Sequence, residues 1–270
     1  MPERPDIFGI VNITEDSFSD GGLYLDHHRA ADHAIALVEA GATVVDLGPA
    51  SSHPDARRVP AQEEIRRLEP VIARLHSVGI PVSVDAYLPE TQSYALGQGV
   101  AYLNDIRGFP DAAIYGELAR ASCGLVVMHS VQRGPASYVR VDPKTVWSRI
   151  FDFFDERVHT LSAAGIASER LILDPGMGFF LGDTPEPSLR VLARIGELKR
   201  RYGLATLVSV SRKSFLRHVA GRETTAVGAA TLAAELYAVR AGVEFVRTHD
   251  VAALRDACRV WSSLSVETGL

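Results

Sequence analysis

Short apolar segments of strand length alternate with amphipathic segments of helical period along nearly the whole chain. This alternation is typical of βαβ units, whose strands run parallel. Strands are expected at eight segments, 7–14, 43–48, 81–86, 101–106, 124–130, 170–176, 205–211 and 244–250. Helices are expected between and after them, at 29–40, 61–78, 91–97, 112–122, 143–164, 187–202, 227–241 and 251–266.

The strand segments are apolar throughout, which indicates that both faces of the sheet are buried. Eight βα units favour a closed parallel barrel, the (β/α)8 or TIM barrel, over an open doubly wound sheet. An open sheet would more often have a glycine-rich turn after its first strand, whereas here that strand runs through Asn12 into a polar segment. The sequence therefore predicts an α/β fold with a single (β/α)8 domain over residues 1–270.

The formal net charge of the 270 residues is -5 at pH 7. Such a charge gives no general attraction for nucleic acid, so no nucleic-acid partner is expected. The apolar runs are too short to span a membrane, and the charged N-terminus does not resemble a signal peptide. Cys123 and Cys258 stand alone in helical patterns, so both are expected to be buried thiols. We expect a cytoplasmic protein without a membrane partner.

Polar side chains end several of the apolar strands. In a parallel barrel, the carboxyl ends of all strands open on one mouth, where barrel enzymes hold their sites. Asp85, Asn104, Asp174 and Lys213 end the third, fourth, sixth and seventh strands. A carboxylate accepts two parallel hydrogen bonds from adjacent N–H groups of a planar ring, while amide and ammonium groups bind its acceptors. This set predicts a site for a flat heterocycle, although a single buried aspartate at a strand end is often only a loop cap.

A second polar group lies on the first and eighth strands, which are neighbours in a closed ring. Asn12 belongs to the first strand, and Arg247 and His249 to the eighth. Residues two apart on a strand point to the same face, so Arg247 and His249 are expected to bind one anion together. His249 alone would more often be structural. The group predicts a phosphate or pyrophosphate site, with Mg²⁺ held through the side-chain oxygen of Asn12.

These motifs together resemble the dihydropteroate synthase family. The resemblance spans most of the chain, in order, and rests on segments 10–14, 16–22, 83–85, 103–106, 128–129, 174–179, 211–214 and 247–249. It implies a (β/α)8 transferase that joins 6-hydroxymethyl-7,8-dihydropterin pyrophosphate to p-aminobenzoate and releases pyrophosphate in folate synthesis. It also implies a homodimer.

The resemblance further implies roles for individual residues. The pterin would be held by Asp85, Asn104, Asp174 and Lys213. The pyrophosphate and its Mg²⁺ would be held by Asn12, Arg247 and His249, which with Lys213 form the expected catalytic set. The p-aminobenzoate pocket would be bordered by Ser52, Pro54, Phe179 and Ser214, and Phe180 and Ser211 join the expected substrate-binding residues.

Two departures from the family pattern affect the second-substrate pocket. The second loop usually reads Gly-Glu-Ser-Thr-Arg-Pro, but residues 48–54 have His53 in place of the arginine, which puts its anion contact in doubt. Phe180 stands where relatives usually have a small residue. These departures are similar to the sulfonamide-insensitive branch of the family. A bulky ring there would reject the sulfonyl and second ring of a sulfonamide more than the small carboxylate of the substrate.

Two other functions share part of this pattern. A pterin-binding methyltransferase barrel has the same pterin-reading strand ends, but it needs no pyrophosphate ligands, so Arg247 and His249 argue against it. A non-catalytic pterin-binding barrel would lose Asn12, Lys213 or Arg247, and all three are present.

Overall fold

Parallel strands close into a barrel at the centre of the molecule. The structure is a computed structural model that describes residues 5–14, 26–132 and 137–268. Within these residues the strands pair in chain order, and the last pairs with the first. They are β1 (Asp6–Asn12), β2 (Val44–Gly48), β3 (Val82–Asp85), β4 (Tyr102–Asp105), β5 (Gly124–Met128), β6 (Leu171–Asp174), β7 (Ala205–Val208) and β8 (Phe245–Thr248). The predicted (β/α)8 barrel is confirmed.

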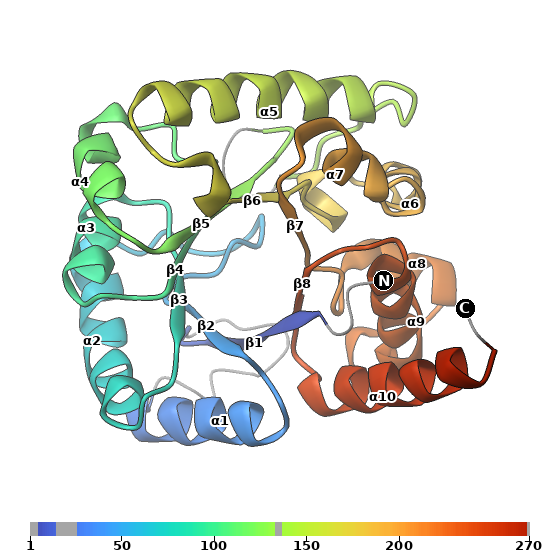
Figure 1. Cartoon of the computed structure of the whole chain (residues 1–270), viewed down its shortest axis with the longest axis horizontal. Coiled ribbons are helices and arrows are strands. Elements are labelled where there is room, and N and C mark those ends of the chain that lie inside the picture. Colours follow the sequence, from blue (N-terminus) through green and yellow to red (C-terminus); the bar gives the residue numbers. More distant parts are fainter. Residues whose placement is uncertain (1–4, 15–25, 133–136, 269–270) are drawn as a thin grey trace.

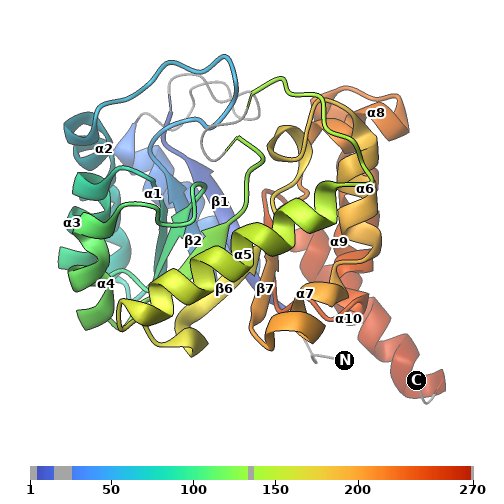
Figure 2. The ribbon, with the colours of Figure 1, turned by 90° about the horizontal axis from the view of Figure 1, so that it is seen from above.

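Helices surround the strands as an outer ring (Figure 1). They are α1 (His27–Glu39), α2 (Ala61–Ser77), α3 (Pro89–Gly97), α4 (Tyr115–Arg120), α5 (Val146–Ala163), α6 (Pro185–Ala193), α7 (Gly196–Tyr202), α8 (Ser214–Ala220), α9 (Gly228–Arg240) and α10 (Val251–Thr268). The connections that follow β2 and β5 rise at one end of the barrel, and the last turns of α10 lie toward the other end (Figure 2). Part of the first loop, residues 15–25, lies outside the described residues.

The single helix expected over 187–202 is wrong, because α6 and α7 are separate helices. At the break, the N–H groups of Arg194 and Ile195 donate to carbonyls three residues back, which tightens the turn and stops α6. Ile195 is buried there. A Cβ added to Gly196 would lie 3.2 Å from the carbonyl oxygen of Ala241, so a glycine restarts the chain where it passes close to a neighbouring segment.

Helix α8 was not expected from the sequence. It begins directly after Lys213 and ends at Gly221, which has a left-handed φ of 60°. Its seven residues make about two turns, too few for a helical hydrophobic period to stand out. The helix matters for function, because it starts at the carboxyl end of the barrel.

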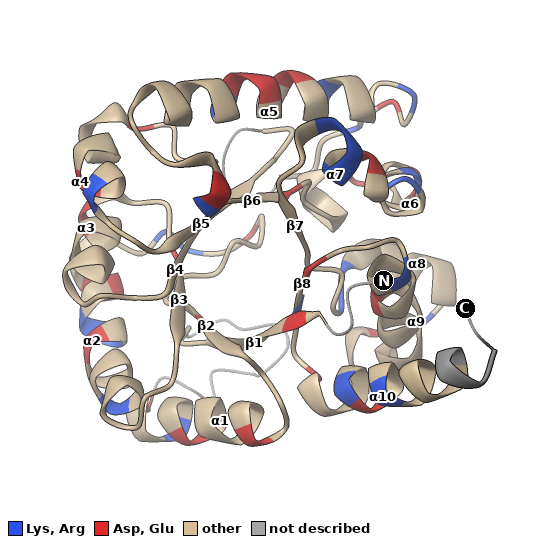
Figure 3. Cartoon of the chain, in the orientation of Figure 1, with Lys and Arg blue, Asp and Glu red and all other residues tan. Residues whose placement is uncertain are grey.

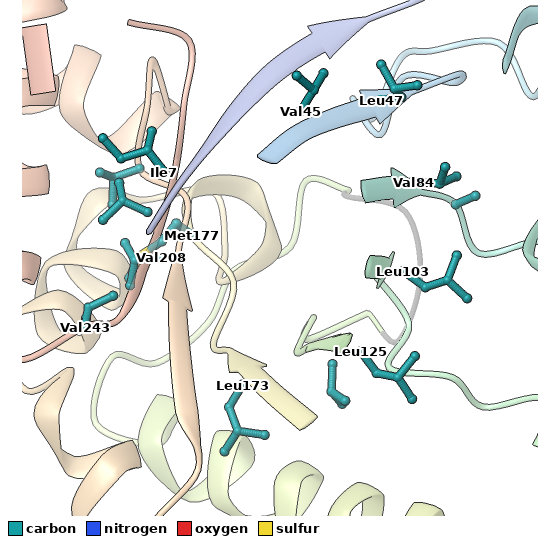
Figure 4. Close-up of a cluster of buried hydrophobic side chains, with 14 of the residues drawn as sticks. Ile7, Val45, Leu47, Val84, Leu103, Leu125, Leu173, Met177, Val208 and Val243 are labelled. Atoms are coloured by element: carbon teal, nitrogen blue, oxygen red, sulfur yellow. The ribbon is translucent and has the colours of Figure 1, made fainter. Parts of the chain in front are cut away.

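Apolar side chains fill the barrel's amino end and its outer face. Phe8, Tyr102 and Phe245 meet edge to face inside the ring, with centroids of Phe8 and Tyr102 4.9 Å apart. Alternate residues point outward and pack under the helices, among them Val45, Leu47, Val84, Leu103 and Leu125 (Figure 4). The charged residues lie largely on the ring of helices (Figure 3). The interior is therefore closed at one end and free to carry polar groups at the other.

Two features from the composition also appear in the structure. Cys123 and Cys258 are both buried and free, as expected. Among the described helices, none is long and apolar enough to cross a membrane.

Candidate active site

A cavity of about 190 Å³ opens at the carboxyl ends of the strands. Strand alternation places its polar groups, because inward-facing positions recur every second residue. On β8, the inward side begins with Phe245 in the apolar floor and continues through Arg247 to His249 at the mouth. The cavity is lined by most of the residues expected from the sequence, namely Asn12, Ser52, Pro54, Asp85, Phe179, Phe180, Ser211, Lys213, Ser214, Arg247 and His249.

Arg247 lies between two carboxylates. Its Nε donates to Asp46 Oδ2 at 2.5 Å, and its Nη2 donates to Asp85 Oδ2 at 2.8 Å. Burial disfavours the charge, but the attraction of Asp46 and Asp85 outweighs it and raises the pKa of Arg247 above its usual value. The guanidinium is therefore permanently charged. Asp46 is fully buried on β2 and was missed in the sequence, although an aspartate inside an apolar strand was its visible signal.

The aspartates at the mouth are poised near neutrality. Burial raises the pKa of Asp85 to about 7, although Arg247 lowers it. Burial likewise raises the pKa of Asp174 to about 6, opposed by a hydrogen bond of 2.8 Å that the Gly176 N–H donates to Oδ1. The second oxygen of Asp174 is left for another donor. Desolvated carboxylates of this kind bind a ligand N–H strongly, because they gain the hydrogen bonds that burial removed.

Asn104 completes the deep part of the site. It pairs in register with Asp85 on the neighbouring strand, and its side chain is 3% exposed. Its Oδ1 is buried without a hydrogen-bond partner. Buried amide oxygens are seldom left unpaired, so this atom is an acceptor waiting for a donor. Asn104 and Asp174 lie near the carboxyl ends of β4 and β6, but neither is among the residues that line the cavity.

Lys213 adds a second cation at the end of the seventh strand segment, just before α8. Burial lowers its pKa to about 8, and Arg247 lowers it further, while Asp174 and Asp85 act in the opposite direction. Its Nζ lies 5.1 Å from the centroid of the Phe180 ring. Lys213 is therefore held beside both aspartates and an aromatic face, and it loses its charge only slightly above neutral pH.

His249 is a neutral imidazole in this site, not the second cation that the sequence suggested. Burial lowers its pKa well below the usual value, and the positive charges of Arg212 and Arg247 lower it further. Its Nδ1 lies 2.9 Å from Ser211 Oγ, which fixes the ring. Its other nitrogen can donate to an anion in the tautomer in which Nδ1 accepts the Ser211 hydroxyl.

Phe179 and Phe180 occupy different parts of the cavity. Phe180 is 4% exposed and packs in a cluster with Ile106 and Met128. Phe179 lies against the second loop, where its ring centroid is 5.8 Å from that of His53. Both rings line the cavity, and Phe179 is the one that lies against His53 of the second loop. A role of Phe180 beside the second substrate stays a prediction. The two rings follow each other in a short 3-10 turn, and Phe179 also packs against the cluster that contains Phe180.

Tyr138, from the connection after β5, packs behind Phe179 of the cavity lining. Its ring meets Phe179 edge to face at 5.2 Å, and its hydroxyl donates to Asp55 Oδ2 at 2.8 Å. The segment after β5 and the second loop therefore meet over Phe179. Arg217 of α8 also lines the cavity and was missed in the sequence, because its helix was missed.

Asn12 is the residue that the sequence offers to Mg²⁺. Among the described residues, no group of three or more histidine, cysteine, aspartate or glutamate side chains could hold a metal ion. Mg²⁺ in phosphate sites, however, usually keeps several waters and takes few protein oxygens besides the phosphates. A Cβ added to Gly48 would lie 3.3 Å from Asn12 Oδ1, so the neighbouring glycine keeps this oxygen uncrowded. The residues fit a Mg²⁺ ion that is shared with a bound pyrophosphate.

Comparisons with known proteins agree on one family for the chain. A family model described as pterin binding enzyme covers residues 8–249. A dihydropteroate synthase type-2 of Escherichia coli is 57% identical over 258 residues, which are 96% of this chain and 95% of the relative. A dihydropteroate synthase type-1 of Mycolicibacterium fortuitum is 51% identical over 259 residues, which are 95% of this chain and 92% of the relative.

Solved structures give the same likeness. Dihydropteroate synthase of Xanthomonas albilineans with 4-aminobenzoic acid is 36% identical, with a TM-score of 0.87 over 97% of this chain and 93% of the other. Dihydropteroate synthase of Yersinia pestis in a sulfonamide drug complex is 30% identical, with a TM-score of 0.88 over 99% of this chain and 96% of the other. The resemblance drawn from the motifs is confirmed.

Proposed function

Because the chain belongs to the pterin-binding enzyme family and is a transferase of the dihydropteroate synthase type, we propose that its barrel mouth joins 6-hydroxymethyl-7,8-dihydropterin pyrophosphate to p-aminobenzoate. The observation that carries the proposal is the set of under-used buried acceptors at the carboxyl ends of β3, β4 and β6. The side-chain oxygens of Asp85, Asn104 and Asp174 could together accept hydrogen bonds from several N–H groups of one planar ring. A pterin ring has such groups on adjacent atoms.

Pterin binding would also make part of the Arg247 guanidinium available to pyrophosphate. In the structure, Asp46 and Asp85 share its guanidinium. When Asp85 accepts hydrogen bonds from the pterin, Asp46 alone keeps the arginine charged and in place. The side of the guanidinium that faced Asp85 is then available to pyrophosphate, beside the neutral His249.

The reaction needs stabilisation of the leaving group more than a base. The methylene C–O bond breaks with its electron pair going to pyrophosphate, the arylamine nitrogen forms the C–N bond, and the amine proton leaves to water. Arg247 and Lys213 both line the cavity and would stabilise the negative charge that develops on pyrophosphate, because electrostatic stabilisation is strong in a buried site. Mg²⁺ bound by Asn12 and the pyrophosphate would neutralise part of the same charge. The cavity walls hold the amine in line with the carbon.

The second substrate would lie between the second loop and the start of α8, bordered by Ser52, Pro54, Phe179 and Ser214, all on the cavity. Ser211 would act through His249, which it holds. Insensitivity to sulfonamides belongs to the same proposal, with the Phe179 ring beside this end. A homodimer and a cytoplasmic location remain predictions.

Incubation with both substrates and Mg²⁺ tests the proposal. We expect 7,8-dihydropteroate and pyrophosphate in equal amounts, with loss of activity on chelation of the metal and little inhibition by sulfamethoxazole. Pyrophosphate release that does not require p-aminobenzoate, or no release at all from folded protein, would refute the assignment.

A further inference from the structure

Arg217 faces the same cavity as the expected second-substrate residues. It lies on α8 three residues after Ser214, and residues three apart share a helix face. Both side chains line the cavity, together with Phe179 of the opposite wall. Arg217 is thus the cation that α8 presents to the outer end of the mouth, one helical turn away from Lys213 at the inner end.

The guanidinium of Arg217 is only partly used. Its Nη1 donates to Thr224 Oγ1 at 3.3 Å, whereas its Nε is buried and has no hydrogen-bond partner. Across the described ranges, no carboxylate forms an ion pair with Arg217, whereas Arg247 has two. A buried N–H of a charged group without an acceptor is costly, so such groups generally have a partner, and at a cavity a ligand can supply it.

The positive charge of Arg217 also acts on Tyr138. The Tyr138 hydroxyl donates to Asp55, which raises its pKa, and the positive charge of Arg217 acts against that rise. Tyr138 packs on Phe179 at the rim of the cavity. Arg217 is therefore near the rim, and no described aspartate or glutamate is paired with it there.

We propose that the free Nε edge of Arg217 binds the carboxylate of p-aminobenzoate and so selects the second substrate by its charge. This inference rests on the proposed function. The amine of the substrate must face the pterin carbon beside Lys213, so the para carboxylate points outward along α8. A guanidinium binds a carboxylate best through two parallel N–H groups on one edge, and the Nε edge is the one that Thr224 leaves open.

The decisive experiment compares p-aminobenzoate with the neutral analogue p-aminobenzamide in steady-state assays of wild type and Arg217→Gln. Loss of a charge-assisted contact should raise KM for p-aminobenzoate about 10- to 100-fold. The kcat should stay within about threefold, since Arg217 is remote from the departing pyrophosphate. The kinetics of p-aminobenzamide and the KM for the pterin pyrophosphate should hardly change. Arg217→Lys keeps the charge but loses the two parallel N–H groups of the guanidinium. Its KM for p-aminobenzoate should lie between those of wild type and Arg217→Gln.

Two controls separate recognition from packing. Arg222→Gln removes an exposed arginine just after α8 and should leave both KM values unchanged. Thr224→Val removes the other partner of Arg217 without removing charge and should have a small effect. The inference is overturned if Arg217→Gln keeps the wild-type KM for p-aminobenzoate. It is also overturned if the substitution raises the KM for p-aminobenzamide as much as the KM for p-aminobenzoate. If Arg217→Gln does not fold, a wild-type KM for p-aminobenzoate in Arg217→Lys overturns it as well. Absence of turnover by wild type would instead refute the proposed function.

Discussion

Replacing Asp174 by asparagine should strongly reduce the use of the pterin substrate. The Gly176 N–H lies 2.8 Å from Asp174 Oδ1 and, in the Asp174→Asn variant, would hold the new amide oxygen in the same place. The amide NH₂ would then face the N–H groups of the pterin, so that a donor meets a donor. Loss of one charged hydrogen bond together with this mismatch is worth on the order of 2–4 kcal/mol, or about 30- to 1,000-fold in kcat/KM.

The assay is kcat/KM for the pterin pyrophosphate at saturating p-aminobenzoate, with the melting temperature as a check on folding. Asp105→Asn is the matched control. Asp105 is equally buried and burial raises its pKa to about 6 as well, but its oxygens accept hydrogen bonds from Gln92 and from the N–H groups of Arg107 and Phe109. That variant should lose stability more than kcat/KM. A folded Asp174→Asn protein with kcat/KM within about threefold of wild type would remove Asp174 from the pterin site.

Three further outcomes are expected. The effects of Arg247→Ala and His249→Ala on pyrophosphate binding with Mg²⁺ should be non-additive, since the two side chains line one end of the cavity; calorimetry that finds equal binding by wild type and the double variant would refute this. The kcat/KM for the pterin substrate should rise with pH through about 6 to 7, where Asp174 and Asp85 lose their protons, and fall above about 8, where Lys213 loses its charge. A flat profile across that window would contradict these assignments. Replacing Phe179 by alanine should tighten sulfamethoxazole inhibition about ten- to a hundredfold, while Phe180→Gly should mainly weaken pterin binding; the reverse pattern would support the expectation drawn from the sequence for Phe180.

The fold and much of the mouth could be predicted because they depend on short-range patterns. Apolar strand runs fix burial, and the two-residue period of a strand fixes which side chains share a face. For this reason Arg247 and His249 were correctly expected on one side of β8, and Asp85 and Asn104 on neighbouring strand ends. Helix α8, which follows β7, could not be predicted in this way, because two helical turns are too short for a hydrophobic period to be recognised.

Contacts across the barrel could not be predicted in this way. Asp46 and Arg247 are 201 residues apart and meet only because the ring closes, with Asp46 on β2 and Arg247 on β8. The charge state of His249 also depends on which cations surround it in space. Phe179 and Phe180 are adjacent in sequence, so only the local turn decides which ring reaches the second loop.

In the proposed function, Asp46 would let Arg247 change its partner without a large energetic cost. A buried arginine that lost its only carboxylate would be left uncompensated, and such loss is strongly destabilising. With Asp46 fully buried beneath it, Arg247 keeps one ion pair whichever group Asp85 binds. The second pair can therefore be exchanged for a ligand while the guanidinium stays in place. An aspartate in the middle of an apolar strand is thus a useful signal in such sequences, because a buried carboxylate requires a partner that the barrel must bring to it.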